Sequence, residues 1–479
     1  MRKIKYILAA AVMTFACNTT AQYLNSAYFL DGYANGHQLN PAKDYDRGGY
    51  VGLPFLNNFN TALRGNIGVK DILYKNPNGQ GLVSFLHPSI TSKEAMDAFH
   101  DKNKLLLDMR LDIFNAGFHA FGGFNTISLS ARSNAGINVP YELFDLTKNL
   151  SNKDYDIREF GATAKAWAEL AFGHSHQIND AWRIGAKAKL LFGVGYINME
   201  MNGLRLDLSN DNQWTATADA TIEAGVKNFK WGNGTETKEY KNQYPGHMTY
   251  QQLDIDPDVD KVGMNGFGLG LDLGVEWDMG KQDLVEGLKL SASLLDLGFI
   301  KWSDVAIAQN RGDAFVFNGF HNIQVDDGPG EPLDDQSDDL GDRLADLYSM
   351  QDGGTTSKST GIGTTLNLAA EYALPSYKKL KFGLLSTTRL QGVYGWNEER
   401  LSVTLSPCKL FELSTSAAVG TFGGNLGWVL NFHPQGFSLF IGADHCIGKF
   451  TKQWVPLRSN YDFSMGIAIP FGKSRIGQD

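Results

Sequence analysis

The sequence predicts an all-β protein, a transmembrane antiparallel β-barrel of about 14 strands with short helices in its loops. Three observations predict it. Long runs alternate apolar and polar residues, one side of those runs is rich in glycine and charge, and no stretch beyond the N-terminus is apolar enough for a membrane helix. The 479-residue chain contains 53 glycines and is 12% aromatic, as expected for strands with a lipid-facing and a luminal side.

The alternation is clearest near the end of the chain. Every second residue of 461–471 is apolar, and 182–192, 214–226, 267–279 and 362–374 repeat the pattern. These runs are longer than the five or so residues of a soluble strand and match the roughly 9–11 that a tilted strand needs to cross a bilayer. A large soluble β-sandwich also has alternating strands, but strand length and composition favour the barrel.

Counting such runs gives about 14 strands. Separate strands are expected to start near Trp214 and Phe267, and the weakest candidates start near Val305 and Leu401. Some segments are too long for hairpin turns. They predict four long loops, at 71–104, 133–160, 227–263 and 309–358.

Helix signals fall within these loops. Thr91 and Glu94 form a capping box before a helix reaching about Asn103, and a second helix is expected over 140–150. Ser337 precedes acids suited to the start of a third. Two points stay open: whether 182–208 is one strand or a hairpin broken at Gly193 and Gly195, and on which membrane side the 227–263 insert lies.

The N-terminus has the features of an export signal. Basic residues precede an apolar run that ends in small residues at Ala21, which predicts a signal peptide over residues 1–21. A buried N-terminal helix and lipidation at Cys17 are the alternatives. Residues 22–58 then form an N-terminal segment, and 59–479 form the barrel with its loops. Export and barrel together predict the outer membrane of a Gram-negative bacterium, with its lipid as partner.

Charge and cysteine content exclude some functions. Removing the signal lowers the net charge from −9 to −12, which argues against nucleic acid as a partner. Cys408 and Cys446 remain, and the strand order places them at opposite ends of the wall, so no disulfide is expected. No serine-hydrolase elbow, zinc-protease motif or phosphate loop is present, so the sequence predicts no enzyme and no cofactor.

Charged residues with luminal parity are the candidate ligand or lumen residues. They are Lys165, Glu169, Arg183, Lys187, Lys189, Asp219, Glu223, Asp272, Glu276 and Glu371. Pairing about a short turn near Ile178 places Glu169 opposite Lys187, within one register step. Structural pairing that satisfies the interior is the favoured interpretation, and a polar pore or specific ligand contacts are the alternatives.

Four alternating aspartates in the 227–263 insert are weak candidates for a metal site. They are Asp254, Asp256, Asp258 and Asp260. Calcium favours clustered carboxylates, but the helix–loop–helix calcium pattern needs glycine where Val259 stands. A solvated acidic loop is therefore the favoured interpretation.

Several segments carry a family resemblance. Residues 38–42, Gln-Leu-Asn-Pro-Ala, are similar to the Asn-Pro-Ala segment near the start of FadL-type outer-membrane proteins. Residues 185–191, 294–302 and 439–444 resemble recurrent strands of Bacteroidota outer-membrane proteins. The chain thus resembles an uncharacterised Bacteroidota barrel family related to FadL, the long-chain fatty-acid transporter. The resemblance implies an N-terminal segment that plugs the lumen and a hydrophobic cargo, and no ligand-contacting residue carries over.

Two functions are therefore carried forward. The first is uptake or passage of a small hydrophobic molecule. The second is a scaffold barrel, closed to solutes, that anchors or serves a surface or secretion protein complex through the acidic segment 309–358. An apolar cavity reaching a gap in the wall would favour passage, whereas a lumen packed by Glu169, Lys187 and their neighbours would favour the scaffold.

Overall fold

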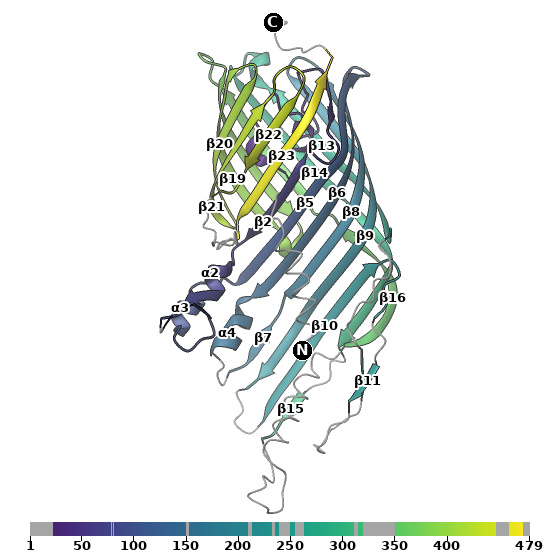
Figure 1. Ribbon diagram of the computed structural model, residues 1–479, viewed down its shortest axis with the longest axis vertical. Helices are drawn as coiled ribbons and strands as arrows, with labels where there is room; N and C mark the ends of the chain where they lie inside the picture. The colour runs from purple at the N-terminus through teal and green to yellow at the C-terminus, as the bar shows by residue number, and fades with distance from the viewer. Residues whose placement is uncertain are drawn as a thin grey trace, which may run out of the picture.

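The computed structural model describes the greater part of the chain. The described residues are 23–77, 79, 81–149, 153–208, 213–231, 235–238, 250–253, 263–310, 315–319, 350–446 and 459–472. Within them, the strands form a closed antiparallel barrel with 14 strand positions (Figure 1), as the sequence predicted. The signal peptide, the expected helix after Ser337 and the four aspartates 254, 256, 258 and 260 lie outside the described residues.

The wall runs in chain order round the barrel. Its strands are β1 (Gly49–Gly52) with β2 (Phe59–Gly65), β5 (Lys102–Ala120), β6 (Gly123–Pro140), β8 (Phe160–Gln177), β9 (Trp182–Asp207), β10 (Trp214–Val226) with β13 (Gly266–Asp278), β14 (Leu288–Asn310), β16 (Met350–Gly361) with β17 (Thr364–Ala373), β18 (Leu380–Leu390), β19 (Trp396–Cys408), β20 (Phe411–Gly420), β21 (Gly423–Phe432), β22 (Ser438–Ala443) and β23 (Tyr461–Phe471). The barrel closes because β23 pairs with both β1 and β2.

Shorter elements decorate this wall. The strands are β3 (Leu73–Lys75), β4 (Leu82–Ser84), β7 (Tyr155–Ile157), β11 (Thr235–Lys238), β12 (Tyr250–Leu253) and β15 (Phe315–Phe317). The helices are α2 (Val69–Ile72), α3 (Ser92–Met96) and α4 (Tyr141–Asn149), with 3-10 turns η1 (Asn25–Ala27), η2 (Gly36–Gln38), η3 (Met279–Gln282) and η4 (Gly392–Tyr394). No described helix has the length and apolar character needed to cross a membrane.

Two predicted strands share one position in the wall. Strand β9 is a single strand of 26 residues. Its Gly195 pairs with Val226 of β10, and its Gly193 pairs with Gly266 of β13. The insert between β10 and β13 therefore leaves the wall part-way along β9 instead of capping an end. Val305 lies inside β14 and starts no strand of its own, whereas Leu401 lies in the genuine strand β19.

Strands on one side are longer than predicted. Strand β6 continues to Pro140 and β16 begins at Met350, so both take in residues that the sequence assigned to loops. In Figure 1, β5 to β10 and β16 extend beyond the shorter strands β19 to β23 and form a taller sheet on that side. The helix after Thr91 ends at Met96, earlier than expected, because β5 begins at Lys102.

The outer surface of the barrel is apolar. Leu269, Leu401 and Leu426 are each half or more exposed on outward-facing positions of three different strands. Trp182 and Trp277 stack with ring centroids 5.1 Å apart beside the short turns. An outward apolar band with aromatic residues near its edge is the surface of a transmembrane barrel.

The two ends of the barrel differ. Short turns such as 121–122 and 409–410 lie at one end, here called the short-turn end, and the extended sheet lies at the other, the long-loop end (Figure 1). Cys408 closes β19 at the short-turn end, whereas Cys446 follows β22 at the long-loop end. Both thiols are free and exposed.

Candidate functional site: the sealed lumen

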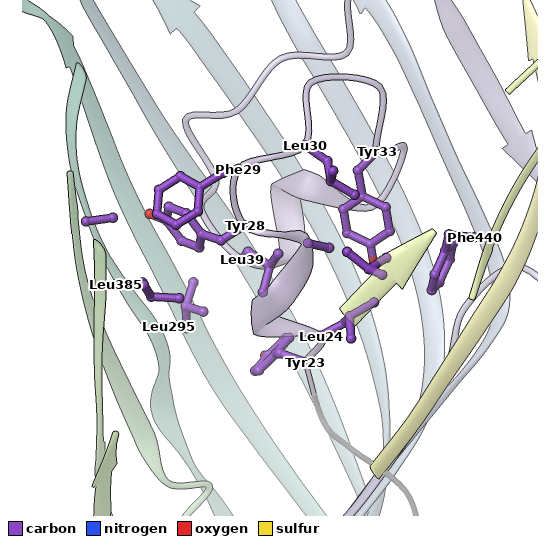
Figure 2. Packing of buried hydrophobic residues seen from close by; sticks show 13 residues of the cluster. Tyr23, Leu24, Tyr28, Phe29, Leu30, Tyr33, Leu39, Leu295, Leu385 and Phe440 are labelled. Carbon is purple, nitrogen blue, oxygen red and sulfur yellow. The ribbon is translucent and has the colours of Figure 1, made fainter. Parts of the chain in front are cut away.

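Residues 23–48, here called the luminal segment, lie inside the barrel. Phe29, Leu30 and Tyr33 are buried with wall residues such as Leu385 and Phe440 (Figure 2). The Tyr33 ring meets that of Phe440 edge to face, with centroids 4.9 Å apart. Apolar side chains from the segment and from several strands therefore form one core in the lumen.

Glycines on the inner wall make room for this segment. A Cβ on Gly383 would lie 2.3 Å from the Phe29 ring. One on Gly185 would lie 2.1 Å from the Pro41 carbonyl oxygen, and one on Gly274 would lie 2.9 Å from Pro41. A larger residue at any of these positions would displace the segment, so the wall holds a fitted seat for the Asn-Pro-Ala stretch.

Carboxylates of the wall anchor the segment's backbone. The N–H groups of Asn25 and Ser26 donate to Asp444 at 2.7 and 2.6 Å. The N–H of Gly32 donates to Glu412 at 3.1 Å. The Oγ atoms of Ser26 and Ser416 lie 3.0 Å apart. Each of these contacts uses a side chain of the wall. They hold the segment against the wall without pairing it as a strand.

Asp444 belongs to a second buried cluster. His445, beside it, contacts Glu398 at 2.7 Å through Nε2 and Asp462 through Nδ1. Arg400 contacts Glu398 at 2.6 Å. Burial opposes protonation of the imidazole, but the two carboxylates outweigh it and raise the pKa of His445 to about 9. An imidazolium therefore stabilises the strand ends that carry the Asp444 anchor.

A layer of paired charges crosses the lumen beyond the luminal segment. We call it the charged layer: Arg110, Asp112, Arg132, Glu169, Lys189, Asp272 and Asp296, all buried. Arg132 lies 2.6 Å from Glu169 and 2.7 Å from Asp296. Lys189 lies 2.6 Å from both Asp272 and Asp296. Buried charges persist only when paired in this way.

Asp296 is the centre of the layer. Its φ of 59° places a non-glycine residue in the left-handed region, at an irregularity in the β13–β14 pairing. Its N–H donates to Asp272 at 2.7 Å, and its carboxylate accepts from Tyr23 of the luminal segment at 2.9 Å. A bulge re-aims a side chain, and here it directs the carboxylate into the lumen.

Arg389 joins facing walls across the barrel. It lies 3.8 Å from Asp108 on β5 and 3.9 Å from Asp296 on β14. Strands β5 and β18 are separated by half of the wall in either direction. The ion pair therefore spans the lumen, and wall side chains as well as the luminal segment occupy the axis.

Charges also ring the short-turn mouth. Two aspartates of the luminal segment form ion pairs there: Asp44 lies 2.6 Å from Arg183, and Asp31 lies 2.7 Å from Lys381. Lys381 in turn lies 3.3 Å from Glu371. A polar cavity of about 130 Å³ lies between these ion pairs, and Glu276 also lines it.

An aromatic cluster lies on the inner wall where the insert departs. Trp167, Tyr196 and Trp302 are buried there with Leu191, Ile300, Val305 and Ile362. Trp302 stacks on Tyr196 at 5.5 Å, and its indole N–H donates to Thr360 at 2.9 Å.

This indole covers a pair of glycines in the wall, which we call the window. A Cβ on Gly193 or Gly266 would lie 2.5 or 2.9 Å from Trp302. Asn265 bridges the adjoining strands: its N–H donates to Gly193 at 2.8 Å, and its carbonyl accepts from Ser303 at 2.9 Å. Beyond it the insert leaves the wall.

Four of the ten predicted residues lie in or beside the charged layer: Glu169, Lys187, Lys189 and Asp272. The predicted pairing of Glu169 with Lys187 is wrong. Glu169 is opposite Leu191, and Lys187 is opposite Gly173, because the turn is centred nearer Asp180 than Ile178. Lys187 instead donates to His37 of the luminal segment at 3.1 Å and lies 4.0 Å from Asp272.

The other predicted residues lie elsewhere. Arg183, Glu276 and Glu371 line the mouth. Lys165 and Glu223 flank Tyr196, whose hydroxyl donates to Glu223 at 2.6 Å. Asp219 is exposed on β10 opposite a bulge in β9, away from both groups. Among the described residues, no cluster of three metal-ligating side chains occurs.

Sequence reasoning missed Arg110, Arg132 and Asp296. Arg110 stands between Asp108 and Asp112 at strict period two, and Arg132 continues the luminal parity of Ser128 and Ser130. That alternation could have identified both. Asp296 could not be found this way, because the bulge shifts the parity of its strand.

A closed barrel with an apolar exterior and a filled lumen defines a transmembrane β-barrel of the outer-membrane type. Residues 41–444 match the model of a family of unknown function, DUF5723. The chain therefore belongs to that family. No curated protein matches it.

Solved structures that resemble the chain are also barrels. The toluene transporter TodX of Pseudomonas putida has 8% identity and a TM-score of 0.37, over 94% of this chain and 98% of that one. A FadL homologue of Pseudomonas aeruginosa has 10% identity and a TM-score of 0.37, over 94% and 96%. The FadL-type barrels expected from the sequence are thus among its neighbours. Because these TM-scores are below 0.5, the assignment of the fold rests on the strand pairing within this chain.

Proposed function

We propose that this outer-membrane barrel passes a small hydrophobic molecule sideways through its wall, and not along its axis. The observation that carries the proposal is the aromatic cluster around Trp302, which faces the lumen on the far side of the charged layer and covers the window. The cluster is buried, so an apolar molecule would take the place of the Trp302 indole against the two glycines of the window.

The axis is an unfavourable route for such a molecule. Passage would have to separate buried pairs such as Arg132–Asp296 and Lys189–Asp272, and an uncompensated buried charge costs several kcal/mol, roughly 3–5 for a broken pair. It would also have to displace the luminal segment from its glycine seats. Both barriers disappear if the molecule leaves the lumen before it reaches the charged layer.

The window suits a lateral exit. Gly193 and Gly266 place no side chain in the lumen, so movement of the Trp302 indole and of the neighbouring Ile300 side chain uncovers the backbone of the wall. In the described part of the chain, Asn265 links the two sides of the adjoining gap, through its backbone bonds to Gly193 and Ser303. A local opening there breaks fewer ladder hydrogen bonds than an opening between two continuous strands.

The test is uptake of a hydrophobic fluorescent probe by intact cells that express the protein. Trp302→Ala should raise the initial uptake rate several-fold, and Trp302→Phe should restore a rate near that of wild type. Trp182→Ala, which removes an indole from the outer surface at the short-turn end, is the matched control. Equal rates for all variants would contradict the lateral route.

A second function has its own supporting observation. The densely paired charged layer, with Arg389 crossing the lumen, suits a solute-closed scaffold that serves a protein complex. In that case wild-type cells would take up no more probe than cells lacking the protein. A protein would instead co-purify in stoichiometric amount, and the acidic segment 309–358 would be the first region to mutate.

A further inference from the structure

A small folded lobe stands at the long-loop rim of the barrel. It comprises residues 66–101, with α2, the β3–β4 hairpin and α3. Its core is aromatic: Phe85 and Phe99 pack with Phe144 of α4, and the rings of Phe99 and Phe144 stack 3.8 Å apart. The lobe is therefore a packed element with its own inside and outside.

The β3–β4 hairpin has an inner face on the aromatic core and an outer face that carries leucines. Tyr74 and Val83 are paired and pack against the aromatic core. The opposite face carries Leu73 and Leu82, paired with Ser84 and Lys75, and Leu82 is 62% exposed. Leu86, just beyond the hairpin, is also exposed. The outer face of a hairpin in water is normally polar, so these leucines call for a partner.

The lobe's position indicates which partner. It follows Gly65 at the end of β2, whose N–H donates to Asn460 beside the start of β23 at 3.1 Å. In Figure 1, α2 and α3 lie beyond the ends of β19 and β21 and outside the outline of the barrel. The outward face of β21 there is lipid-facing, with Leu426 half exposed. The lobe that carries the exposed leucines thus adjoins the lipid-facing part of the wall.

We propose that the lobe lies on the surface of the membrane that the barrel spans, with Leu82 and Leu86 inserted at the lipid interface. The charged side chains of the lobe are of both signs, as in the Lys93–Asp97 and Lys70–Asp71 pairs. Apolar insertion, and not attraction to anionic lipid, therefore holds the lobe at the membrane. This anchoring does not depend on what the barrel carries.

Site-directed spin labelling tests the proposal in the full-length protein. In a Cys408→Ser/Cys446→Ser background, one nitroxide is placed at Leu82→Cys and a control nitroxide at Lys93→Cys, whose native side chain is 84% exposed on α3. The protein is reconstituted in phospholipid vesicles. Position 82 should be more accessible to oxygen and less accessible to a water-soluble nickel complex than position 93.

Two outcomes would overturn the proposal. If position 82 is as accessible to the nickel complex as position 93, the leucines face water. If position 82 is shielded from both oxygen and nickel, another protein or a second copy of this chain covers them instead of lipid.

Discussion

At the scale of single residues, the lumen depends on a few buried charges, and Asp296 joins the most of them. It contacts Arg132, Lys189 and Tyr23, so one carboxylate links three wall strands to the luminal segment. Its left-handed backbone has a cost of order 1–3 kcal/mol, which persists only where surrounding contacts fix it.

Replacing Asp296 by alanine should destabilise the protein by about 3–5 kcal/mol, because Arg132 and Lys189 would stay buried without this partner. The free energy of unfolding in urea, followed by tryptophan fluorescence in detergent micelles, measures the change. Asp219→Ala, at an exposed carboxylate, is the matched control and should shift the value by less than about 0.5 kcal/mol. Equal effects of the two substitutions would refute the central role of Asp296.

Protonated His445 should make the free energy of unfolding fall as the pH becomes alkaline. Its pKa of about 9 in the folded state, against an ordinary value of 6.5, stabilises the fold fully below pH 6.5. That contribution, on the order of 3 kcal/mol, should be lost as the pH rises through 9. His445→Gln should remove this part of the loss, as measured by urea midpoints at pH 7 and pH 10. A wild-type protein and variant with the same pH dependence would contradict this assignment.

At the scale of elements, the wall and the luminal segment are fitted by glycines. Gly383→Val should push Phe29 off its seat, because even a Cβ would lie 2.3 Å from the ring. The displaced segment should expose Ser26, so Ser26→Cys in the Cys408→Ser/Cys446→Ser background should react faster with a maleimide. Gly203→Val, at a β9 position with open space around it, is the control. Unchanged labelling in Gly383→Val would show that the seat does not hold the segment.

Alternation predicted the strands well and failed where strands are irregular. Runs such as 461–471 obey period two because one side meets lipid and the other the lumen. A bulge in β14 breaks this parity near Asp296, so the sequence overlooked that carboxylate. Asp219 keeps its place in the alternation of β10 but is exposed opposite a bulge in β9, so the sequence placed it in the lumen. The split of one wall position into β10 and β13 also left no local signal, since each half alternates like a whole strand.

At the scale of the whole molecule, the fold class and strand number could be predicted, but the contacts across the lumen could not. Asp108 and Arg389 are far apart in the sequence and meet only because the barrel closes. The same holds for Ser26 and Ser416, and for Pro41 on Gly185. Such contacts depend on curvature and on the path of the luminal segment, which periodicity does not encode.

The central claim is that the axis stays sealed while a hydrophobic molecule leaves through the wall. Its most direct test is a reversible lock between Ser26 and Ser416, whose Oγ atoms are 3.0 Å apart and so suit a disulfide. Ser26→Cys/Ser416→Cys, in the Cys408→Ser/Cys446→Ser background, is oxidised to fix the luminal segment and reduced to release it. Uptake of the hydrophobic probe by intact cells is measured in both states, with Ser26→Cys alone as control. The lateral route predicts equal uptake in the oxidised and reduced states, whereas uptake that stops on oxidation and returns on reduction would contradict it.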